Sequence, residues 1–183
     1  DHNLAIGLGT DGSMSSDNQN LFEAMRFAAL VNKVRFPHAA ERWIGARVVW
    51  EMATTGSARL LGMADDIGAV APGRKADLVL LRGDSAFLRP LNHPLNALVY
   101  AETGADVETV LIDGRMVLKQ GRVLTVDEGR LRARAQQAAE RVRAHNAGAW
   151  ALAEQLTPYL SAACRAAVAT PYPVNRYATP PSS

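Results

Sequence analysis

A short apolar run that stops at an acidic turn is the feature that most constrains the fold. Residues 4–8 read Leu-Ala-Ile-Gly-Leu, and a Gly-Thr-Asp-Gly turn carrying Asp11 follows. Such a run predicts a strand buried on both faces, as in a parallel sheet. A helical apolar stripe then covers residues 21–33, and Ser16 stands at capping-box spacing before Gln19. We therefore predict a strand, a loop and a helix.

Further helices are expected before residue 63. Pro37 suits the first turn of a second helix that ends near residues 54–56. Residues 56–62 predict one more short helix, which Gly62 stops by taking the left-handed conformation.

Strand patterns follow from Ile67 onward. The apolar run at residues 77–81 predicts one strand. Residues 107–112 and 115–118 flank an Asp-Gly pair, which readily adopts the positive φ angles of a two-residue hairpin turn. A further short strand is expected at residues 122–126.

The last part of the chain is helical and then proline-rich. Residues 128–155 carry apolar side chains at helical intervals between arginines, which predicts an amphipathic helix with a solvated basic face. Residues 171–183 hold four prolines with Ser and Thr and predict a disordered tail without its own core.

Composition narrows the class of protein. The chain has 183 residues, 48% hydrophobic and 21% charged, which is typical of a globular protein rather than a disordered one. Its net charge of +2 is weak evidence for nucleic acid binding. We expect no nucleic acid partner, no membrane partner and a cytoplasmic location, since neither a spanning run nor a leader pattern is found. The single cysteine, Cys164, is expected to be a buried or half-buried apolar residue.

Asp11 is the first candidate for chemistry. A carboxylate at the carboxyl end of a parallel strand lies where α/β barrels place reacting groups, and it can bind a metal or move a proton. From the tripeptide alone, turn chemistry, in which Asp11 bonds nearby backbone amides, is the favoured explanation.

The residues after Asp11 are weaker candidates for contact with a substrate. Ser13, Ser16 and Asn18 can hydrogen-bond a substrate, although helix capping and turn preference also account for them. The four histidines are dispersed and show no metal-binding spacing.

Three segments in order carry a family resemblance: residues 7–12, 53–62 and 67–81. Together with the hairpin at residues 107–122, they resemble the C-terminal part of the metal-dependent amidohydrolase superfamily, over about residues 4–145. The Gly-Thr-Asp-Gly form is most similar to the branch of cytosine, guanine and adenosine-analogue deaminases and triazine chlorohydrolases.

The resemblance implies an α/β fold with two composite parts. Residues 1–66 would supply the last strand and helices of a (β/α)8 TIM-like barrel, and residues 67–126 the C-terminal share of a small β-sandwich. Residues 127–170 would form the C-terminal helical segment and residues 171–183 the tail.

The resemblance also implies an activity. Members of this kind hold one divalent metal, for which zinc is expected first and iron second. Asp11 would bind the metal and take a proton from its water during deamination of an amino-substituted nitrogen heterocycle. The substrate would be a small molecule, and a homo-oligomer is expected for the full-length protein.

Departures from the family pattern limit this expectation. The superfamily's His-x-His pair and its other metal-binding histidines have no counterpart, and the chain opens at Asp1 almost directly on the expected strand. We therefore expect a C-terminal fragment that is inactive by itself. Two alternatives remain: a non-catalytic binding or scaffold module of the same fold, and a single-strand-binding domain that uses the arginine-rich helix.

Overall fold

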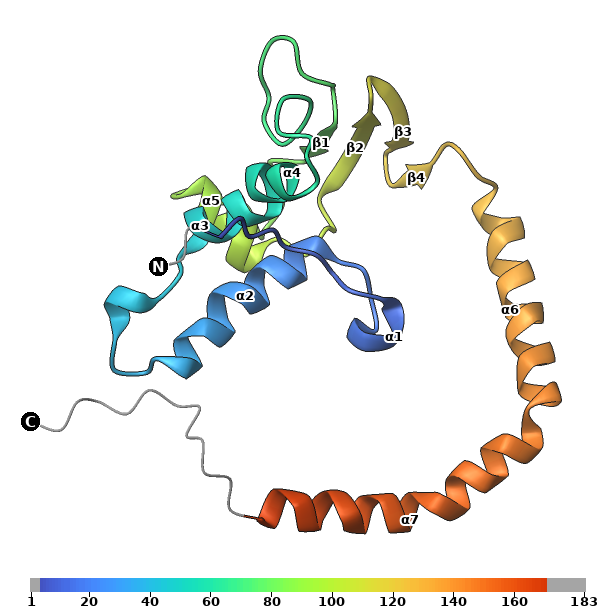
Figure 1. Cartoon of the computed structure of the whole chain (residues 1–183). Coiled ribbons are helices and arrows are strands. Elements are labelled where there is room, and N and C mark those ends of the chain that lie inside the picture. The colour runs from blue at the N-terminus through green and yellow to red at the C-terminus, as the bar shows by residue number, and fades with distance from the viewer. Residues whose placement is uncertain (1–3, 171–183) are drawn as a thin grey trace, which may run out of the picture. The chain divides into compact units, whose positions relative to one another are not determined.

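The chain divides into two compact units, each described here by itself. The computed structural model describes residues 4–170, so the predicted tail at 171–183 lies outside the described residues. Within that range, the first unit covers residues 4–125 and the second begins at Val126. Figure 1 shows the element order. No helix between residues 4 and 170 is long and apolar enough to cross a membrane.

Helices make up the first half of the first unit. They are α1 (Ser13–Ser16), α2 (Leu21–Arg35), a 3₁₀ turn η1 (Ala40–Arg42), α3 (Ala46–Glu51), a π-helical turn η2 (Met52–Gly56) and α4 (Ser57–Leu60). A second helical stretch, α5 (Pro94–Asn96) with the π-helical turn η3 (Ala97–Ala101), lies between strands and was not expected from the sequence.

The core of this unit lies where α2, α3 and η3 meet. Its buried side chains come from all three elements: Met25, Ala29, Ala46, Val49 and Val99. Met25 and Ala29 are four residues apart on α2, so one helical face supplies both. The core therefore joins the helix that follows the acidic turn to a segment far along the chain.

The predicted strand at residues 4–8 is not formed, which corrects the first expectation. Residues 4–12 belong to no strand or helix. The backbone N–H of Leu8 donates to the carbonyl of Met52 at 3.1 Å, so it bonds to a helix rather than to a neighbouring strand. A strand needs a ladder of such bonds with a partner strand, and this segment makes its contact with a helix instead.

The helix boundaries also differ from the prediction. The Asn20 side chain caps α2, accepting from the N–H groups of Phe22 and Glu23, so Ser16 is not its cap. Pro37 lies in a turn, and the next α-helix begins at Ala46. No helix ends at residues 54–56, because η2 continues directly into α4. Gly62 does follow this helix with a φ of 71°, as expected.

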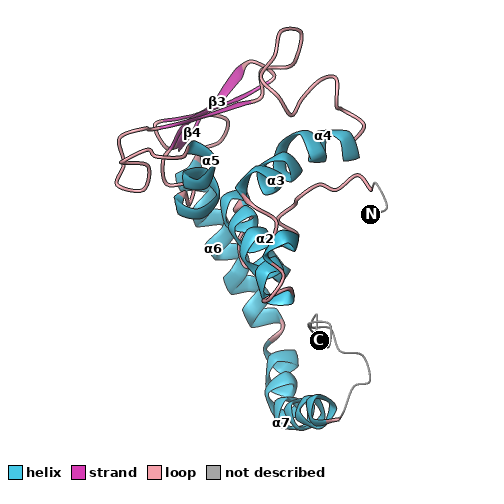
Figure 2. Ribbon diagram, turned by 90° about the vertical axis from the view of Figure 1, so that its left-hand side faces the viewer, coloured by secondary structure: helices cyan, strands magenta, loops and turns pink. Residues whose placement is uncertain are grey.

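The sheet confirms most of the strand predictions. It has four antiparallel strands in the order β1-β2-β3-β4: β1 (Leu78–Leu81), β2 (Val107–Ile112), β3 (Arg115–Lys119) and β4 (Arg122–Val123). Asp113 and Gly114 join β2 to β3 with φ angles of 50° and 76°, which both central residues of a type I′ turn require. The last strand is shorter than predicted. In Figure 2 the strands lie above the helices of this unit.

The second unit is helical. It contains α6 (Glu128–His145) and α7 (Ala147–Ala169), so the single helix expected over residues 128–155 is in fact two. Asp127 caps α6 by accepting from the N–H of Arg130 at 2.9 Å. Cys164 is exposed, which corrects the expectation that it is at least half-buried.

Candidate functional site

Asp11 lies in an exposed turn with left-handed backbone geometry. Its φ is 60°, a conformation that Asp tolerates better than most residues. Its Oδ1 accepts from the N–H of Gly12 at 2.7 Å, and the Thr10 hydroxyl donates to the Asp11 carbonyl at 3.3 Å. The turn chemistry considered from the sequence is therefore present, and the carboxylate is also open to solvent.

The backbone before Asp11 is fastened to the helix at Ser57. The Ser57 hydroxyl accepts from the N–H of Leu8 at 3.1 Å and lies 2.8 Å from the Met52 carbonyl, to which it donates. Ser57 lies within residues 53–62, one of the three segments that carry the family resemblance. The motif therefore positions the segment that leads into Asp11.

Gly56 lets this segment approach the helix closely. A Cβ on Gly56 would lie 2.5 Å from the carbonyl oxygen of Ile6 and 2.9 Å from that of Glu51. Such distances are shorter than real Cβ contacts, so the approach depends on a glycine at this position.

Replacing Ser57 with alanine is expected to lower the free energy of unfolding by about 1 kcal/mol, because the hydroxyl's hydrogen bonds are lost while the Leu8 N–H and the Met52 carbonyl stay bonded to each other. Chemical denaturation of the chain measures the change. An unchanged midpoint would show that the Ser57 hydroxyl does not hold the segment.

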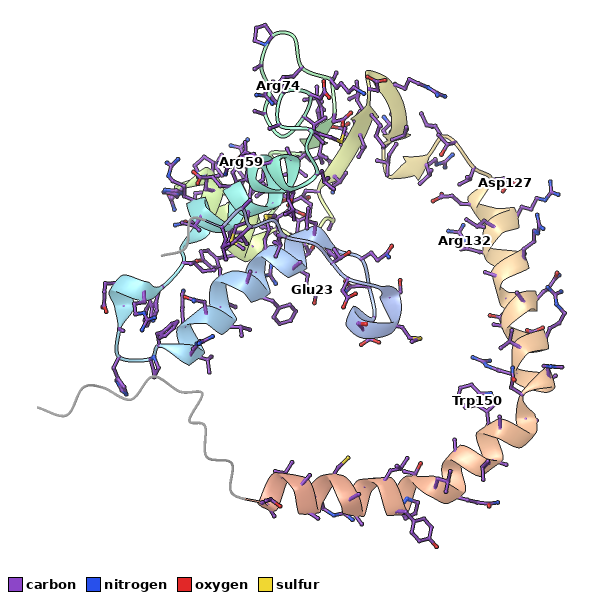
Figure 3. All side chains as sticks on the ribbon, viewed as in Figure 1. Glu23, Arg59, Arg74, Asp127, Arg132 and Trp150 are labelled. Carbon is purple, nitrogen blue, oxygen red and sulfur yellow. The ribbon has the colours of Figure 1, made fainter. Side chains whose placement is uncertain are left out.

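The third resemblance segment packs on the other side of the same helix. A Cβ on Gly68, whose φ is 90°, would lie 2.8 Å from that of Ala58. The Arg74 guanidinium donates to the carbonyls of Ile67, at 2.8 Å, and Ala64, which closes the loop. Arg59 and Arg74 are labelled in Figure 3. A cavity of about 300 Å³ lies here, and Asp11 is not among its lining residues: Thr55, Arg59, Ala64, Asp65, Ile67 and Arg74.

The other predicted site residues follow Asp11 closely in the chain. Ser13 begins α1 and is exposed. Ser16 ends α1, and its side chain lies outside what the structure describes. The Asn18 amide accepts from the N–H of Asn20 at 3.0 Å and donates to the Glu23 carboxylate. Asn18 therefore supports the start of α2, and substrate contact by any of the three stays a prediction.

The described residues do not make a metal site by themselves. Between residues 4 and 170, no group of three or more His, Cys, Asp or Glu side chains could hold a metal ion. A structural or catalytic zinc needs three or four ligands. Asp11 offers one carboxylate, so any metal bound there requires further ligands.

Two buried carboxylates near the start of α2 were not found from the sequence. Glu102 is 1% exposed, and its Oε1 accepts from the N–H groups of Thr103 and Gly104 at 3.0 and 2.6 Å. The Asn20 amide donates to the Thr103 carbonyl at 2.6 Å. Since Asn20 also caps α2, Glu102 helps to fix the helix that follows the Asp11 turn.

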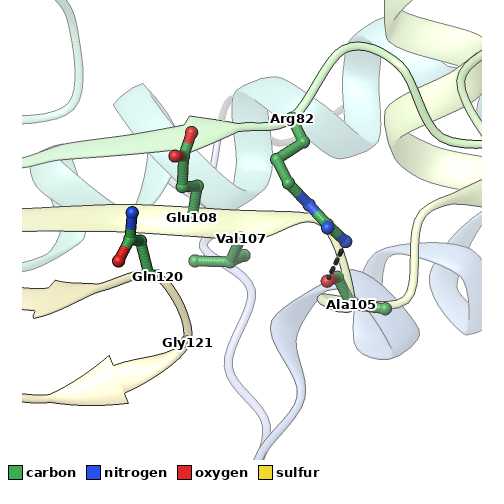
Figure 4. A pocket seen from close by; sticks show the side chains of 6 residues that line it. All are labelled: Arg82, Ala105, Val107, Glu108, Gln120 and Gly121. Atoms are coloured by element: carbon green, nitrogen blue, oxygen red, sulfur yellow. Dashed lines mark hydrogen bonds between the residues drawn. The ribbon is translucent and has the colours of Figure 1, made fainter.

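Asp106 is 2% exposed and lies four residues after Glu102. It joins the segment of residues 102–106 to residues that follow β1. Its Oδ1 lies 3.3 Å from Nη2 of Arg82, and its Oδ2 accepts from the Ser85 hydroxyl. Figure 4 shows a neighbouring cavity of about 280 Å³, where Arg82 Nη2 also donates to the Ala105 carbonyl at 3.4 Å. Asp11 does not line this cavity, so it is separate from the candidate site.

The chain belongs to the amidohydrolase family, whose sequence profile matches residues 1–117. Its relatives are of the deaminase-like branch, which confirms the resemblance. The 5-methylthioadenosine/S-adenosylhomocysteine deaminase of Acetivibrio thermocellus is 40% identical over 139 residues, which are 76% of this chain and 32% of that protein. The 5′-deoxyadenosine deaminase of Methanothermobacter thermautotrophicus is 39% identical over 123 residues, covering 67% and 28%.

Solved structures agree with the family assignment. An adenosine deaminase from Xanthomonas campestris with bound zinc aligns with a TM-score of 0.73 and 33% identity, over 77% of this chain and 32% of that one. An atrazine chlorohydrolase from Arthrobacter aurescens complexed with zinc aligns with a TM-score of 0.68 and 31% identity, over 73% and 29%. The chain thus spans about a third of the length of the curated relatives it matches.

Proposed function

We propose that this chain contributes Asp11 to the active site of a metal-dependent hydrolase that deaminates an amino-substituted nitrogen heterocycle. The observation that carries the proposal is the 40% identity to a protein named as a 5-methylthioadenosine/S-adenosylhomocysteine deaminase. A second relative is named as a 5′-deoxyadenosine deaminase, so the heterocycle we propose is the adenine ring of a 5′-modified nucleoside.

The proposed metal is zinc, with iron as the second choice. Support comes from the zinc bound in structures similar to this chain. A carboxylate is an oxygen donor that zinc accepts, and beside a metal it can also receive a proton. Asp11 is exposed and held in a fixed turn, which suits both tasks. The proposal requires additional ligands from outside residues 4–170.

The barrel and sandwich assignments belong to the same proposal. Residues 4–66 would then be the barrel portion that carries Asp11, and the antiparallel sheet β1–β4 would be part of the smaller sandwich.

The test uses the full-length product of the gene, whatever its length. The purified protein is assayed for metal by mass spectrometry and for ammonia release from 5′-deoxyadenosine and 5′-methylthioadenosine. We expect about one zinc or iron per chain and ammonia release that a chelator abolishes. The 183-residue chain assayed alone is expected to release none.

A metal-free product that deaminates neither nucleoside would contradict the proposal and favour the scaffold alternative. Ammonia release from cytosine or guanine alone would keep the reaction class and overturn the nucleoside assignment.

A further inference from the structure

The second unit carries an apolar seam that runs through both of its helices. Large and small apolar side chains recur at alternating spacings of three and four residues from Leu131 to Ala166, with His145 as the one polar member: Leu131, Ala135, Ala138, Val142, His145, Ala149, Leu152, Leu156, Tyr159, Ala163 and Ala166. The spacing continues across Asn146, where α6 ends and α7 begins. An alternation of this kind over more than four heptads is the signature of a coiled-coil seam.

The seam lies open in this structure. Leu131, Val142 and Leu152 are each 55–56% exposed, Leu156 is 45% exposed and Tyr159 is 75% exposed. No residue of α6 or α7 is buried. Pro158, within α7, falls on the outer side of the helix by the same spacing, so its ring does not enter the seam.

We propose that this seam pairs with the same seam of a second copy of the chain, in antiparallel orientation, so that α6 of one copy packs on α7 of the other. An antiparallel pair centred level with Ala147 matches a large side chain with alanine in four of its five facing pairs, and Val142 faces Leu152 in the fifth. The facing pairs are Leu131 with Ala163, Ala135 with Tyr159, Ala138 with Leu156, Val142 with Leu152, and His145 with Ala149. Alternating large and small residues across a seam lets its layers interdigitate.

A parallel pair would match the seam much less well. Each residue would then face itself, which sets Ala135 against Ala135 and His145 against His145. Alanine facing alanine leaves space in the seam, and two facing imidazoles bring polar groups together in an apolar contact. The antiparallel arrangement avoids both problems.

Charge favours the same orientation. Three of the four residues beside the seam in α6 are arginines, at positions 132, 134 and 141, and the fourth is Ala139. The residues beside the seam in α7 are uncharged, among them Ala153, Gln155, Leu160, Ala162 and Ala167. Packing α6 on α7 therefore keeps the arginines of the two copies apart, because each lies beside an uncharged position. Pairing α6 of one copy with α6 of the other, in opposite directions, would bring the arginines of the two copies together.

The centre of the proposed pair coincides with the junction of α6 and α7 in the backbone. The chain changes direction where α6 meets α7, as Figure 1 shows, and Asn146 has a ψ of 17° there. A twofold axis that passes between the two copies, level with Ala147, puts this change at the middle of the pair in both copies. From Leu131 to Ala166 the seam would run about 50 Å at 1.5 Å per residue. With a contact strip about 10 Å wide, the pair would bury on the order of 1,000 Å², which a specific interface needs.

The test measures the oligomeric state of the 183-residue chain by sedimentation equilibrium. We expect a dimer, and Leu156→Glu on the seam is expected to raise its dissociation constant more than tenfold. Val168→Glu is the matched control: it makes the same kind of change on α7, but at an outer position that is 87% exposed. A monomeric parent chain, or a dimer that Leu156→Glu leaves intact, would overturn the proposal.

Disulfide trapping tests the orientation in a Cys164→Ser background. Leu131→Cys should not link to itself, because its two copies would lie at opposite ends of the antiparallel pair, about 48 Å apart along the seam. A mixture of Leu131→Cys and Ala163→Cys chains should form the mixed disulfide. Self-linking of Leu131→Cys would contradict the antiparallel orientation. Binding of a monomer to phosphatidylglycerol vesicles would instead assign the seam to a lipid surface.

Discussion

Replacing Asp11 with asparagine is expected to lower kcat/KM for deamination at least about 10³-fold in the full-length gene product. An amide cannot accept a proton as a carboxylate does, and loss of an acid–base group costs roughly 10²–10⁴ in rate. The neutral amide is also a poorer metal ligand, so bound zinc should fall as well. Asparagine tolerates the φ of 60° at this position, which keeps the turn intact. The assay follows ammonia release and metal content together.

Asp17→Asn supplies the matched control. Asp17 is exposed, has the same φ of 60° and lies at the other end of the short helix α1, but the proposal gives it no role in chemistry. Its substitution should leave both activity and metal content near the parent values. Equal losses in the two variants would mean that the loop, and not the Asp11 carboxylate, determines the activity.

Elements with local chemical signals were predictable from the sequence. The hairpin of β2 and β3 was found because Asp113-Gly114 provides the positive φ angles of its turn, and apolar runs flank it. The strand β1 and the glycine end of α4 at Gly62 were found for the same kind of reason. In each case the determining residues lie within a few positions of the element.

Elements that depend on distant partners were not predictable in this way. The apolar run at residues 4–8 reads as a strand, but Leu8 bonds to Met52 and Ser57 on a helix 44 or more residues further along. The expected helix end near residues 54–56 failed because η2 carries the helix through Gly56. A glycine within a helix suggests a break, and here it serves a close contact with Ile6 instead.

The same distinction between local and distant signals applies to the residues of the candidate site. Asp11 could be selected because an acid in a glycine turn after an apolar run is a local pattern. Glu102 and Asp106 could not, because their residue types favour exposure and only the folded chain shows that both are buried. Substrate contact by Ser13, Ser16 and Asn18 stays a prediction. These residues follow Asp11 in the sequence, but no contact in the structure tests whether they bind a substrate.

Replacing Gly56 with alanine is the second large effect that we expect. The new Cβ would lie 2.5 Å from the Ile6 carbonyl oxygen, so the segment of residues 6–8 must move away from the helix. Overpacking of this kind costs about 1–3 kcal/mol, and alanine recovers at most about 1 kcal/mol through its higher helix propensity. The free energy of unfolding should therefore fall by about 1–2 kcal/mol, measured by denaturation of the 183-residue chain.

Gly83→Ala separates this contact from a general effect of glycine substitution. Gly83 lies in an exposed turn after β1, outside the left-handed region, and a Cβ there would meet nothing within 4 Å. Its replacement should change stability by no more than about 0.5 kcal/mol, as for most substitutions away from such contacts. In the full-length product, Gly56→Ala should also lower activity, because displacement of residues 6–8 moves Asp11, and a shift of about 1 Å can cost on the order of 10²-fold. A Gly56→Ala variant as stable and as active as the parent would show that this helix does not position Asp11.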